Sequence, residues 1–242
     1  MQTVMKTSTE SKTAQPVCSS CNVFPSTIFR DGSPKELQKS FNCKSFIRFR
    51  RNETLFHENE PANGVFCIYS GMLKVVKKDH RSMEHIIRLG KPGDVLGIDS
   101  VMTHFKYSNT VVAVDTVEAC FVPKECFMKF IQAHPAFFVD TMKLLCSQLD
   151  RMEDKISDLM GKSMKERLAD MLLMLKANYG VASDHTLNMT LSMDELASFL
   201  GTTKSSVYSL LSDFKRARVI DIQDNRIQVL SEKELESIAH PG

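Results

Sequence analysis

The stretch from Pro135 to Leu159 constrains the chain more than any other, because its apolar residues repeat with the spacing of a coiled coil. Successive apolar positions alternate between four and three residues apart for three heptads, which places one narrow stripe against a partner helix. The predicted dimer-interface residues are Phe138, Met142, Leu145, Leu149, Met152, Ile156 and Leu159. The alternative is a long helix packed on its own domain, although such a helix usually shows a broader apolar face. We therefore expect a dimerisation helix over residues 135–160.

Length and composition set broad limits on the rest of the chain. A chain of 242 residues suits two domains of ordinary size. The formal net charge of +2 neither demands nor excludes a nucleic-acid partner, because local clustering of charge decides that question. Seven scattered cysteines, an odd number, argue against a disulfide scaffold and favour a reducing compartment.

The amino-terminal residues show no targeting or membrane signal. Residues 1–17 are polar and lack the apolar core of a signal peptide, so we expect a disordered arm. No apolar run approaches the length that crosses a bilayer. The sequence therefore predicts a soluble cytoplasmic protein with no membrane partner.

Residues 18–134 have the pattern of an antiparallel β domain. From Phe46 onward, short runs rich in β-branched and aromatic residues are separated by turn residues. Helical periodicity is absent between these runs, which predicts a barrel or jelly roll.

Residues 161–242 have the pattern of a helix-turn-helix. Ser192 and Glu195 form a capping box that starts one helix, Gly201 ends it, and Thr202 or Thr203 caps the next. The run VIDIQDNRIQVL then alternates around an Asp-Asn turn, as expected for a β-hairpin wing. The alternative is a helical protein-interaction domain whose serine-rich face is only solvated.

The second of these helices has short polar residues opposite its apolar stripe. Such side chains suit a face that approaches base edges, and flanking basic residues can contact phosphates. The predicted DNA-binding residues are Thr203, Lys204, Ser205, Ser206, Tyr208, Ser209, Ser212 and Arg216.

Several segments resemble the CRP/FNR family of transcription regulators. ETLFHENEPANGVFCIYSGMLKVVK, IIRLGKPGDVLGIDSV and YSNTVVAVDTVEACFVPKECF resemble its cyclic-nucleotide-binding β-roll, and MTLSMDELASFLGTTKSSVYSLLSDFKRARVI resembles its DNA-binding domain. The resemblance implies an α+β protein with an N-terminal β-roll (jelly roll) sensor, a long dimerisation helix and a C-terminal winged helix-turn-helix. It further implies a homodimeric regulator rather than an enzyme, with a palindromic operator in double-stranded DNA and RNA polymerase as partners.

One departure affects the operator. Many family members carry glutamate and arginine at the positions of Ser205 and Ser209, so the usual half-site of the family cannot be assumed.

The effector pocket implied by the resemblance falls on Gly97, Ile98, Asp99, Ser100, Tyr107 and Ser108. Ile98 stands where a glutamate takes the ribose hydroxyl, and Tyr107 stands where an arginine clamps the cyclic phosphate. Asp99 would point to the opposite face if this segment were extended. The effector is therefore unidentified, and cyclic AMP is not expected to bind.

The cysteines suggest a second sensor. Oxygen-sensing FNR proteins hold an iron–sulfur cluster with N-terminal cysteines and one cysteine of the β-roll. Cys18, Cys21 and Cys120 match this set, and Cys43 is the presumed fourth ligand, because Thr27 occupies the third N-terminal position. The alternatives are a reversible Cys18–Cys21 disulfide, Cys120 as a small core residue, or no redox role. No chemistry is assigned to Cys67, Cys126 or Cys146.

Two other classes of protein remain as rivals. One is a cupin-like β-roll enzyme, although His57, His80, His85 and His104 lack the clustered spacing of metal ligands. The other is a nucleotide-responsive regulatory subunit that never touches DNA.

Overall fold

The structure is a computed structural model that describes residues 18, 21–27, 29–30, 33–103, 106–224 and 226–241. The arm predicted over residues 1–17 lies outside the described residues. The chain divides into two compact units, which are described separately. The first unit runs up to Leu73 and resumes from Pro92 to Leu144, and the second combines Lys74–Lys91 with Leu145–Gly242.

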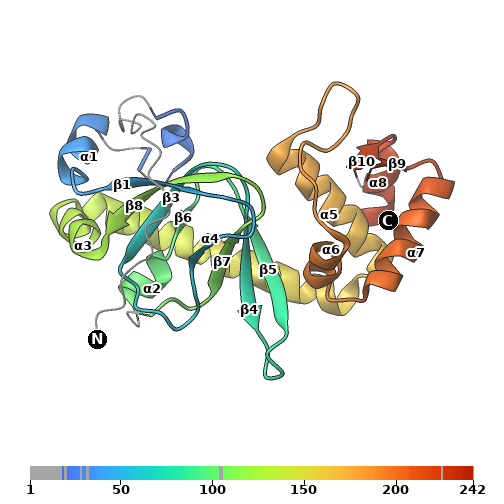
Figure 1. The fold of residues 1–242 in the computed structure, drawn as a ribbon, viewed down its shortest axis with the longest axis horizontal. Coiled ribbons are helices and arrows are strands. Elements are labelled where there is room, and N and C mark those ends of the chain that lie inside the picture. Colours follow the sequence, from blue (N-terminus) through green and yellow to red (C-terminus); the bar gives the residue numbers. More distant parts are fainter. Residues whose placement is uncertain are drawn as a thin grey trace. The chain divides into compact units, whose positions relative to one another are not determined.

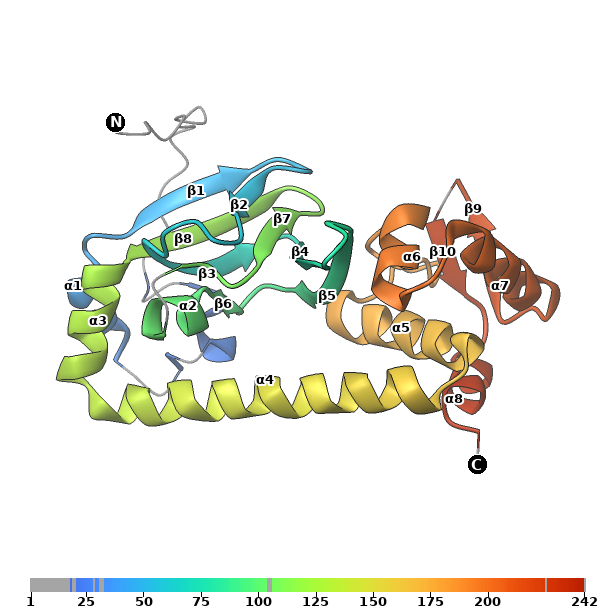
Figure 2. The same ribbon diagram turned by 90° about the horizontal axis from the view of Figure 1, so that it is seen from below.

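The strands of the N-terminal half form two four-stranded sheets. One has the order β1-β8-β3-β6 and the other the order β2-β7-β4-β5. Figure 2 shows β1, β8 and β3 of the first sheet side by side. The strands are β1 (Ser45–Phe49), β2 (Thr54–Phe56), β3 (Gly64–Ser70), β4 (Leu73–Lys78), β5 (Glu84–Gly90), β6 (Val95–Leu96), β7 (Thr110–Ala113) and β8 (Val117–Pro123). The predicted antiparallel β-roll is confirmed.

Short helices complete the first unit, which also holds an aromatic cluster. They are η2 (Phe24–Ser26), α1 (Pro34–Ser40), α2 (Ile98–Met102) and α3 (Lys124–Ala133). The rings of Phe29, Phe41, Phe130 and Phe137 lie with centroids 4.8–6.0 Å apart. Aromatic pairs at this spacing stabilise a core beyond the area they bury, so this cluster fixes the N-terminal segment and α1 against α3.

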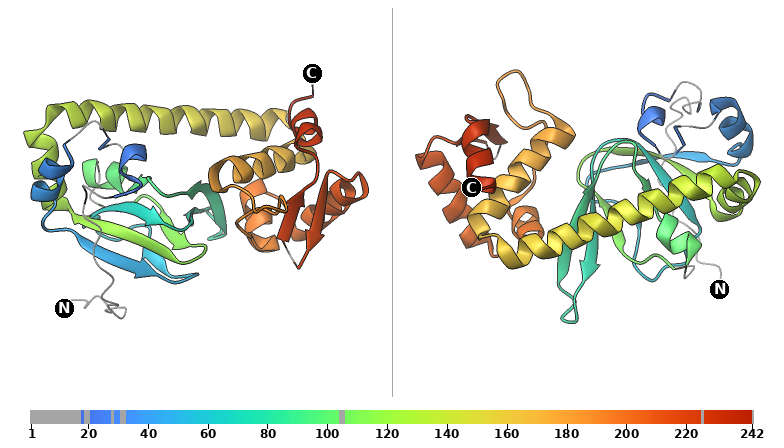
Figure 3. Two further views of the ribbon diagram at one scale, coloured as in Figure 1. Left: turned by 90° about the horizontal axis from the view of Figure 1, so that it is seen from above. Right: turned by 180° about the vertical axis from the view of Figure 1, so that it is seen from behind.

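Helix α4 (Pro135–Gly161) is unbroken over 27 residues, as both views of Figure 3 show. Of the seven predicted seam residues, Phe138, Met142, Leu149, Met152, Ile156 and Leu159 are 45–58% exposed, and Leu145 is half-buried. A single chain thus leaves this apolar stripe in contact with water.

The second unit has a small helical core with a two-stranded sheet, grouped together in Figure 1. Its elements are α5 (Met164–Tyr179), α6 (Met193–Leu200), α7 (Lys204–Arg216), β9 (Ile220–Gln223), β10 (Arg226–Val229) and α8 (Glu232–Ala239). Both sides of the Ser192–Glu195 capping box form, and the Thr203 side chain caps α7. Gly201, between the two helices, has a left-handed φ of 66°. This conformation is unfavourable for residues that carry a side chain. The predicted helix-turn-helix with a small wing is confirmed.

The β4–β5 hairpin is part of this second unit, which the sequence did not indicate. The Ile86 amide donates to Ser198 Oγ of α6 at 3.0 Å, and that hydroxyl donates to the carbonyl of Glu84 at 3.1 Å. The Tyr179 hydroxyl donates to the carbonyl of Gly90 at 3.2 Å. The hairpin is therefore tied to the first helix of the helix-turn-helix and to α5.

Within the described residues, no helix is both long enough and apolar enough to cross a membrane.

Candidate DNA interface and sensor pockets

Helix α7 presents a continuous polar face on the second unit. Its buried residues Val207, Leu211 and Phe214 pack inward, as the periodicity predicts. All the predicted DNA-contacting residues are exposed except Ser206, which is half-buried. Tyr208 is 56% exposed, a large fraction for an aromatic side chain. The structure therefore gathers the predicted residues on one accessible face.

Hydroxyl groups form hydrogen bonds with one another at the start of this face. Thr203 Oγ1 accepts from the Ser206 amide at 3.3 Å and lies 2.9 Å from Ser205 Oγ and 3.0 Å from Ser206 Oγ. Backbone amides are unsatisfied in the first turn of a helix, and the dipole there favours negative charge. This end of α7 can therefore accept a phosphate oxygen as well as a base edge.

The basic residues around α7 have acidic neighbours. Lys204 Nζ lies 2.7 Å from Asp194, and Arg216 pairs with Asp213. These pairs are solvent-exposed, so they are weak and can be exchanged for phosphate contacts.

Lys215 has a structural role instead. Its Nζ lies 2.7 Å from Asp221 Oδ1 and donates to the Ile222 carbonyl at 3.2 Å. The Lys215 hydrogen bond lowers the pKa of Asp221 to about 2, with help from Gln223 and the Ile222 amide. Lys215 therefore joins α7 to the wing strand β9.

Tyr107, which the resemblance aligns with the arginine of the phosphate clamp, is buried in the core of the β-roll. Its ring stacks on Phe56 with centroids 3.8 Å apart, and its hydroxyl donates to the Gly64 carbonyl at 2.8 Å. Burial raises the pKa of Tyr107 to about 12. A side chain on Gly97 would come within 3.0 Å of this ring. The Tyr107 ring is therefore held on both sides of the residue, by stacking on Phe56 and by the hydrogen bond of its hydroxyl to Gly64.

The predicted pocket residues divide into a core pair and a polar cluster. Ile98 is 2% exposed and Tyr107 is 4% exposed. The extended segment considered for Asp99 is wrong, because Gly97, with φ of 85°, leads directly into helix α2. Asp99 accepts hydrogen bonds from the hydroxyls of Ser108 and Ser100, and the Ser108 amide donates to Ser100 Oγ at 3.1 Å. The carboxylate is thus held by neighbouring serines.

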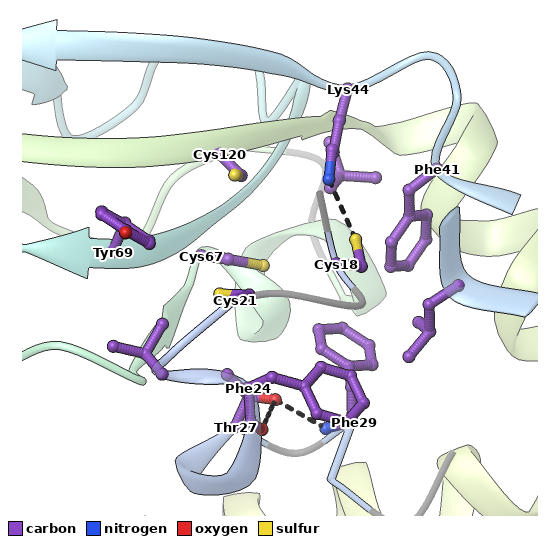
Figure 4. A pocket seen from close by; sticks show the side chains of 13 residues that line it. Cys18, Cys21, Phe24, Thr27, Phe29, Phe41, Lys44, Cys67, Tyr69 and Cys120 are labelled. Carbon is purple, nitrogen blue, oxygen red and sulfur yellow. Dashed lines mark hydrogen bonds between the residues drawn. The ribbon is translucent and has the colours of Figure 1, made fainter. Parts of the chain in front are cut away.

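Four cysteines line a small cavity of the first unit, shown in Figure 4. Cys18 and Cys21 come from the N-terminal segment, while Cys67 of β3 and Cys120 of β8 are directly opposed in the sheet register. The cavity has a volume of about 50 Å³. This volume admits a few water molecules, whereas sites for small organic ligands are several hundred Å³.

The cysteine set differs from the predicted one. Cys43 is bonded to Cys126 in a disulfide, so Cys43 as a fourth ligand is wrong, and Cys126 has a chemical role that was not expected. Cys67 takes its place at the cavity. Cys67 was missed because it lies in an ordinary β-prone run, and only the pairing of β3 with β8 brings it opposite Cys120.

These cysteines do not fit a bound metal centre. Among the residues described, no three His, Cys, Asp or Glu side chains are grouped so that they could hold a metal ion. Burial raises the pKa of Cys67, and burial raises that of Cys120 to about 11.

Two family descriptions match the chain. "Cyclic nucleotide-binding domain" matches residues 46–134, and "Crp-like helix-turn-helix domain" matches residues 166–238. The first match covers most of the β-roll, and the second runs from α5 into α8.

Named relatives are similar over most of their length. The CRP-like cAMP-activated global transcriptional regulator of Mycobacterium tuberculosis is 22% identical over 210 residues, which cover 86% of this chain and 94% of the relative. The global nitrogen regulator of Nostoc sp. is 28% identical over 185 residues, covering 75% and 83%. The structure of FixK2 from Bradyrhizobium japonicum is similar with a TM-score of 0.72 and 19% identity, over 81% of this chain and 98% of that one, which shows the shared fold.

A β-roll, a long helix and a winged helix-turn-helix with an accessible polar helix define a DNA-binding transcription regulator rather than an enzyme. The chain belongs to the CRP/FNR family of such regulators.

Proposed function

We propose that this chain acts in the cytoplasm as a homodimer that reads a palindromic operator with α7 of each protomer. The observation that carries the proposal is the exposed polar face of α7, on which seven of the eight predicted contact residues are exposed. Short hydroxyl side chains and one tyrosine can approach base edges, and Lys204 and Arg216 can exchange their acidic neighbours for phosphates.

The exposed heptad seam of α4 supports the homodimer. Large apolar side chains that are about half exposed along one stripe cost free energy in water, and a second copy of the same helix buries them in register. A two-fold dimer requires a two-fold operator, with half-sites one helical turn, about 34 Å, apart.

The signal that controls DNA binding is proposed to act on the first unit, through an effector or through the cysteines. The stacked position of Tyr107 and the buried Ile98 argue against cyclic AMP as that effector. The Mycobacterium tuberculosis relative is named a global transcriptional regulator, which supports RNA polymerase as the protein partner at promoters.

Selection from a pool of random duplexes tests the proposal directly. The full chain should enrich a palindrome whose half-site centres are about 10–10.5 base pairs apart. Ser209→Ala should alter the enriched bases, whereas Ser147→Ala, outside α7, should not. Failure to enrich any sequence, or enrichment of one with no two-fold symmetry, would contradict the proposal.

A further inference from the structure

Four thiols face one apolar cavity of the first unit, and they differ in chemical setting. Cys18, Cys21, Cys67 and Cys120 are all half-buried, so a small reagent can reach them. Figure 4 shows their sulfur atoms around the same space, with Lys44 beside one of them. Within the described residues, no group of side chains could hold a metal ion. The chemistry of this cavity therefore depends on the reactivity of the individual thiols.

Cys18 is the thiol with a cationic partner. Lys44 Nζ donates to Cys18 Sγ at 2.9 Å, and the Cys18 amide donates to Gln38 Oε1 at 3.0 Å. Cysteines beside a lysine ammonium group are among the more reactive ones in proteins, so this contact points to Cys18 as the attacking sulfur.

Cys67 and Cys120 are in the opposite situation. Burial raises the pKa of both thiols, so they remain protonated at neutral pH. They face each other across β3 and β8, but neither is set up to attack first.

Cys21 is placed to complete the reaction. Its amide donates to the Cys18 carbonyl at 3.4 Å. A hydrogen bond of this kind, between residues three apart, keeps the two Cα atoms within about 7 Å, close to the range of about 4.4–6.8 Å that a disulfide spans.

We propose that Cys18 and Cys21 form a peroxide-reactive dithiol that reports oxidation to the regulator, with Cys18 as the attacking sulfur and Lys44 as its positioning residue. The role of this oxidation as a signal rests on the proposed function, whereas the thiol chemistry itself does not. In the first step, the Cys18 thiolate forms an S–O bond with hydrogen peroxide, the O–O bond breaks, and the departing hydroxide takes a proton to leave as water. In the second step, Cys21 sulfur attacks the sulfenic sulfur, the S–O bond breaks, and the Cys21 proton leaves with the hydroxide as a second water. Two electrons pass from the two thiols to the peroxide.

Oxidation changes the contacts at this site. The disulfide bond takes the sulfur to which Lys44 donates, and so weakens one contact between the N-terminal segment and the residues that follow α1. The Cys18 amide bond to Gln38 Oε1 and the Phe29–Phe41 ring contact do not involve sulfur and remain.

Peptide mapping of the full chain tests the chemistry without DNA. The reduced protein is treated with equimolar hydrogen peroxide, alkylated under denaturing conditions and cut with trypsin. Cys18 and Cys21 share the peptide 13–30, while Cys67 lies in 52–74 and Cys120 in 107–124. We expect peptide 13–30 to lose both alkyl groups and two hydrogens first, while the other two peptides stay alkylated.

Two variants separate mechanism from simple accessibility. Lys44→Met should slow the oxidation of peptide 13–30 about tenfold, and Lys39→Met, an exposed lysine of α1, should leave the rate unchanged. Cys21→Ser should stop the reaction at a sulfenic acid on Cys18 that dimedone traps. Equal rates in the two lysine variants, or earlier oxidation of Cys67 or Cys120, would overturn the proposal. So would a stoichiometric metal in the purified protein that Cys18→Ser removes.

A parallel arm measures binding of the reduced and oxidised chains to the selected operator. If the reduced chain fails to bind any duplex, the proposed function fails while the dithiol chemistry stands. If the disulfide forms but operator affinity changes less than twofold, the dithiol is not the signal.

Discussion

Lys74 of β4 donates to Glu195 of α6 across 2.8 Å, and the two side chains are only 19% and 7% exposed. The same carboxylate accepts from the Ser192 amide and hydroxyl, at 2.9 and 3.0 Å. One side chain therefore both caps the first helix of the helix-turn-helix and ties it to the β4–β5 hairpin.

This pair predicts a specific loss of stability. Lys74→Met removes the cation that faces a buried carboxylate and should lower the free energy of unfolding by about 3 kcal/mol. Lys78→Met is the matched control on the same strand, because its partner Glu84 lies 3.7 Å away and both side chains are more than half exposed. That control should cost less than about 0.5 kcal/mol. Urea unfolding followed by far-UV circular dichroism measures both, and equal losses would contradict the assignment.

The contribution of the Lys74–Glu195 pair to stability should be lost at low pH. Burial alone would raise the pKa of Glu195, but hydrogen bonds from Lys74 and Ser192 hold it below its ordinary value. A lowered carboxyl pKa means that the stabilisation is complete above the ordinary value and is lost as the pH falls through the lowered one. The difference in stability between the wild type and Lys74→Met should therefore shrink in acid.

Lys155 gives a pH dependence of the opposite sense. Its Nζ donates to the Ile87 carbonyl at 2.9 Å and lies 4.1 Å from the ring centroid of Phe199, and burial lowers its pKa from 10.5 to about 8. Between these values the unfolded chain binds more protons, so stability should rise with pH from about 8 to about 10.5. The stability of Lys155→Met should not rise in this way when the unfolding of both proteins is measured over the same pH range. The same rise in stability with pH in both proteins would show that this lysine does not titrate as described.

The heptad seam predicts a change of oligomeric state. Leu149→Asp combined with Met152→Asp places charges from two helices against each other and should give monomers with no operator binding. Gln148→Asp with Arg151→Asp, outside the seam, should remain dimeric. Sedimentation equilibrium decides between them, and a dimer in the seam variant would refute the interface.

Cyclic AMP should leave the thermal stability unchanged. A ligand at about 100 times its Kd stabilises the folded state by about 2.7 kcal/mol, which is readily seen as a shift in Tm. The Mycobacterium tuberculosis relative, named as cAMP-activated, is the positive control. A clear shift in this chain would mean that Tyr107 moves out of its stacked position.

Substitutions in α7 should separate the effect of charge on affinity from the effect of its serines on base preference. Lys204→Ala should weaken all duplexes alike and reduce the salt slope by about one unit per protomer. Ser205→Glu with Ser209→Arg should instead move the selected half-site, because arginine reads guanine bidentately with about 1–3 kcal/mol of discrimination. Unchanged base preferences in the double variant would show that α7 is not the reading helix.

Local signals predicted the parts of the molecule that depend on neighbouring residues. The Ser192–Glu195 capping box, the left-handed Gly201 and the heptad spacing of α4 each involve only a few turns of chain, and all three appear in the structure.

Features built by distant residues were not predictable in this way. Cys67 reaches the thiol cavity only through its pairing with Cys120, 53 residues further on in the β3–β8 register. Cys43 looked like a free ligand because nothing in its local sequence points to Cys126, 83 residues away. The resemblance located Tyr107 in the pocket, but its stacking on Phe56 follows from tertiary packing.

The hairpin contacts also bear on how the chain is made. Lys74 and Glu195 are 121 residues apart, and Ile86 and Ser198 are 112 apart. At a synthesis rate of about 5–20 residues per second, the hairpin leaves the ribosome roughly 6–24 s before the helix it contacts. During that interval Lys74 and Ile86 lack the partners in α6 that they have in the folded chain. The second unit can therefore be completed only late in synthesis, although part of its β4–β5 hairpin is translated within the first third of the chain.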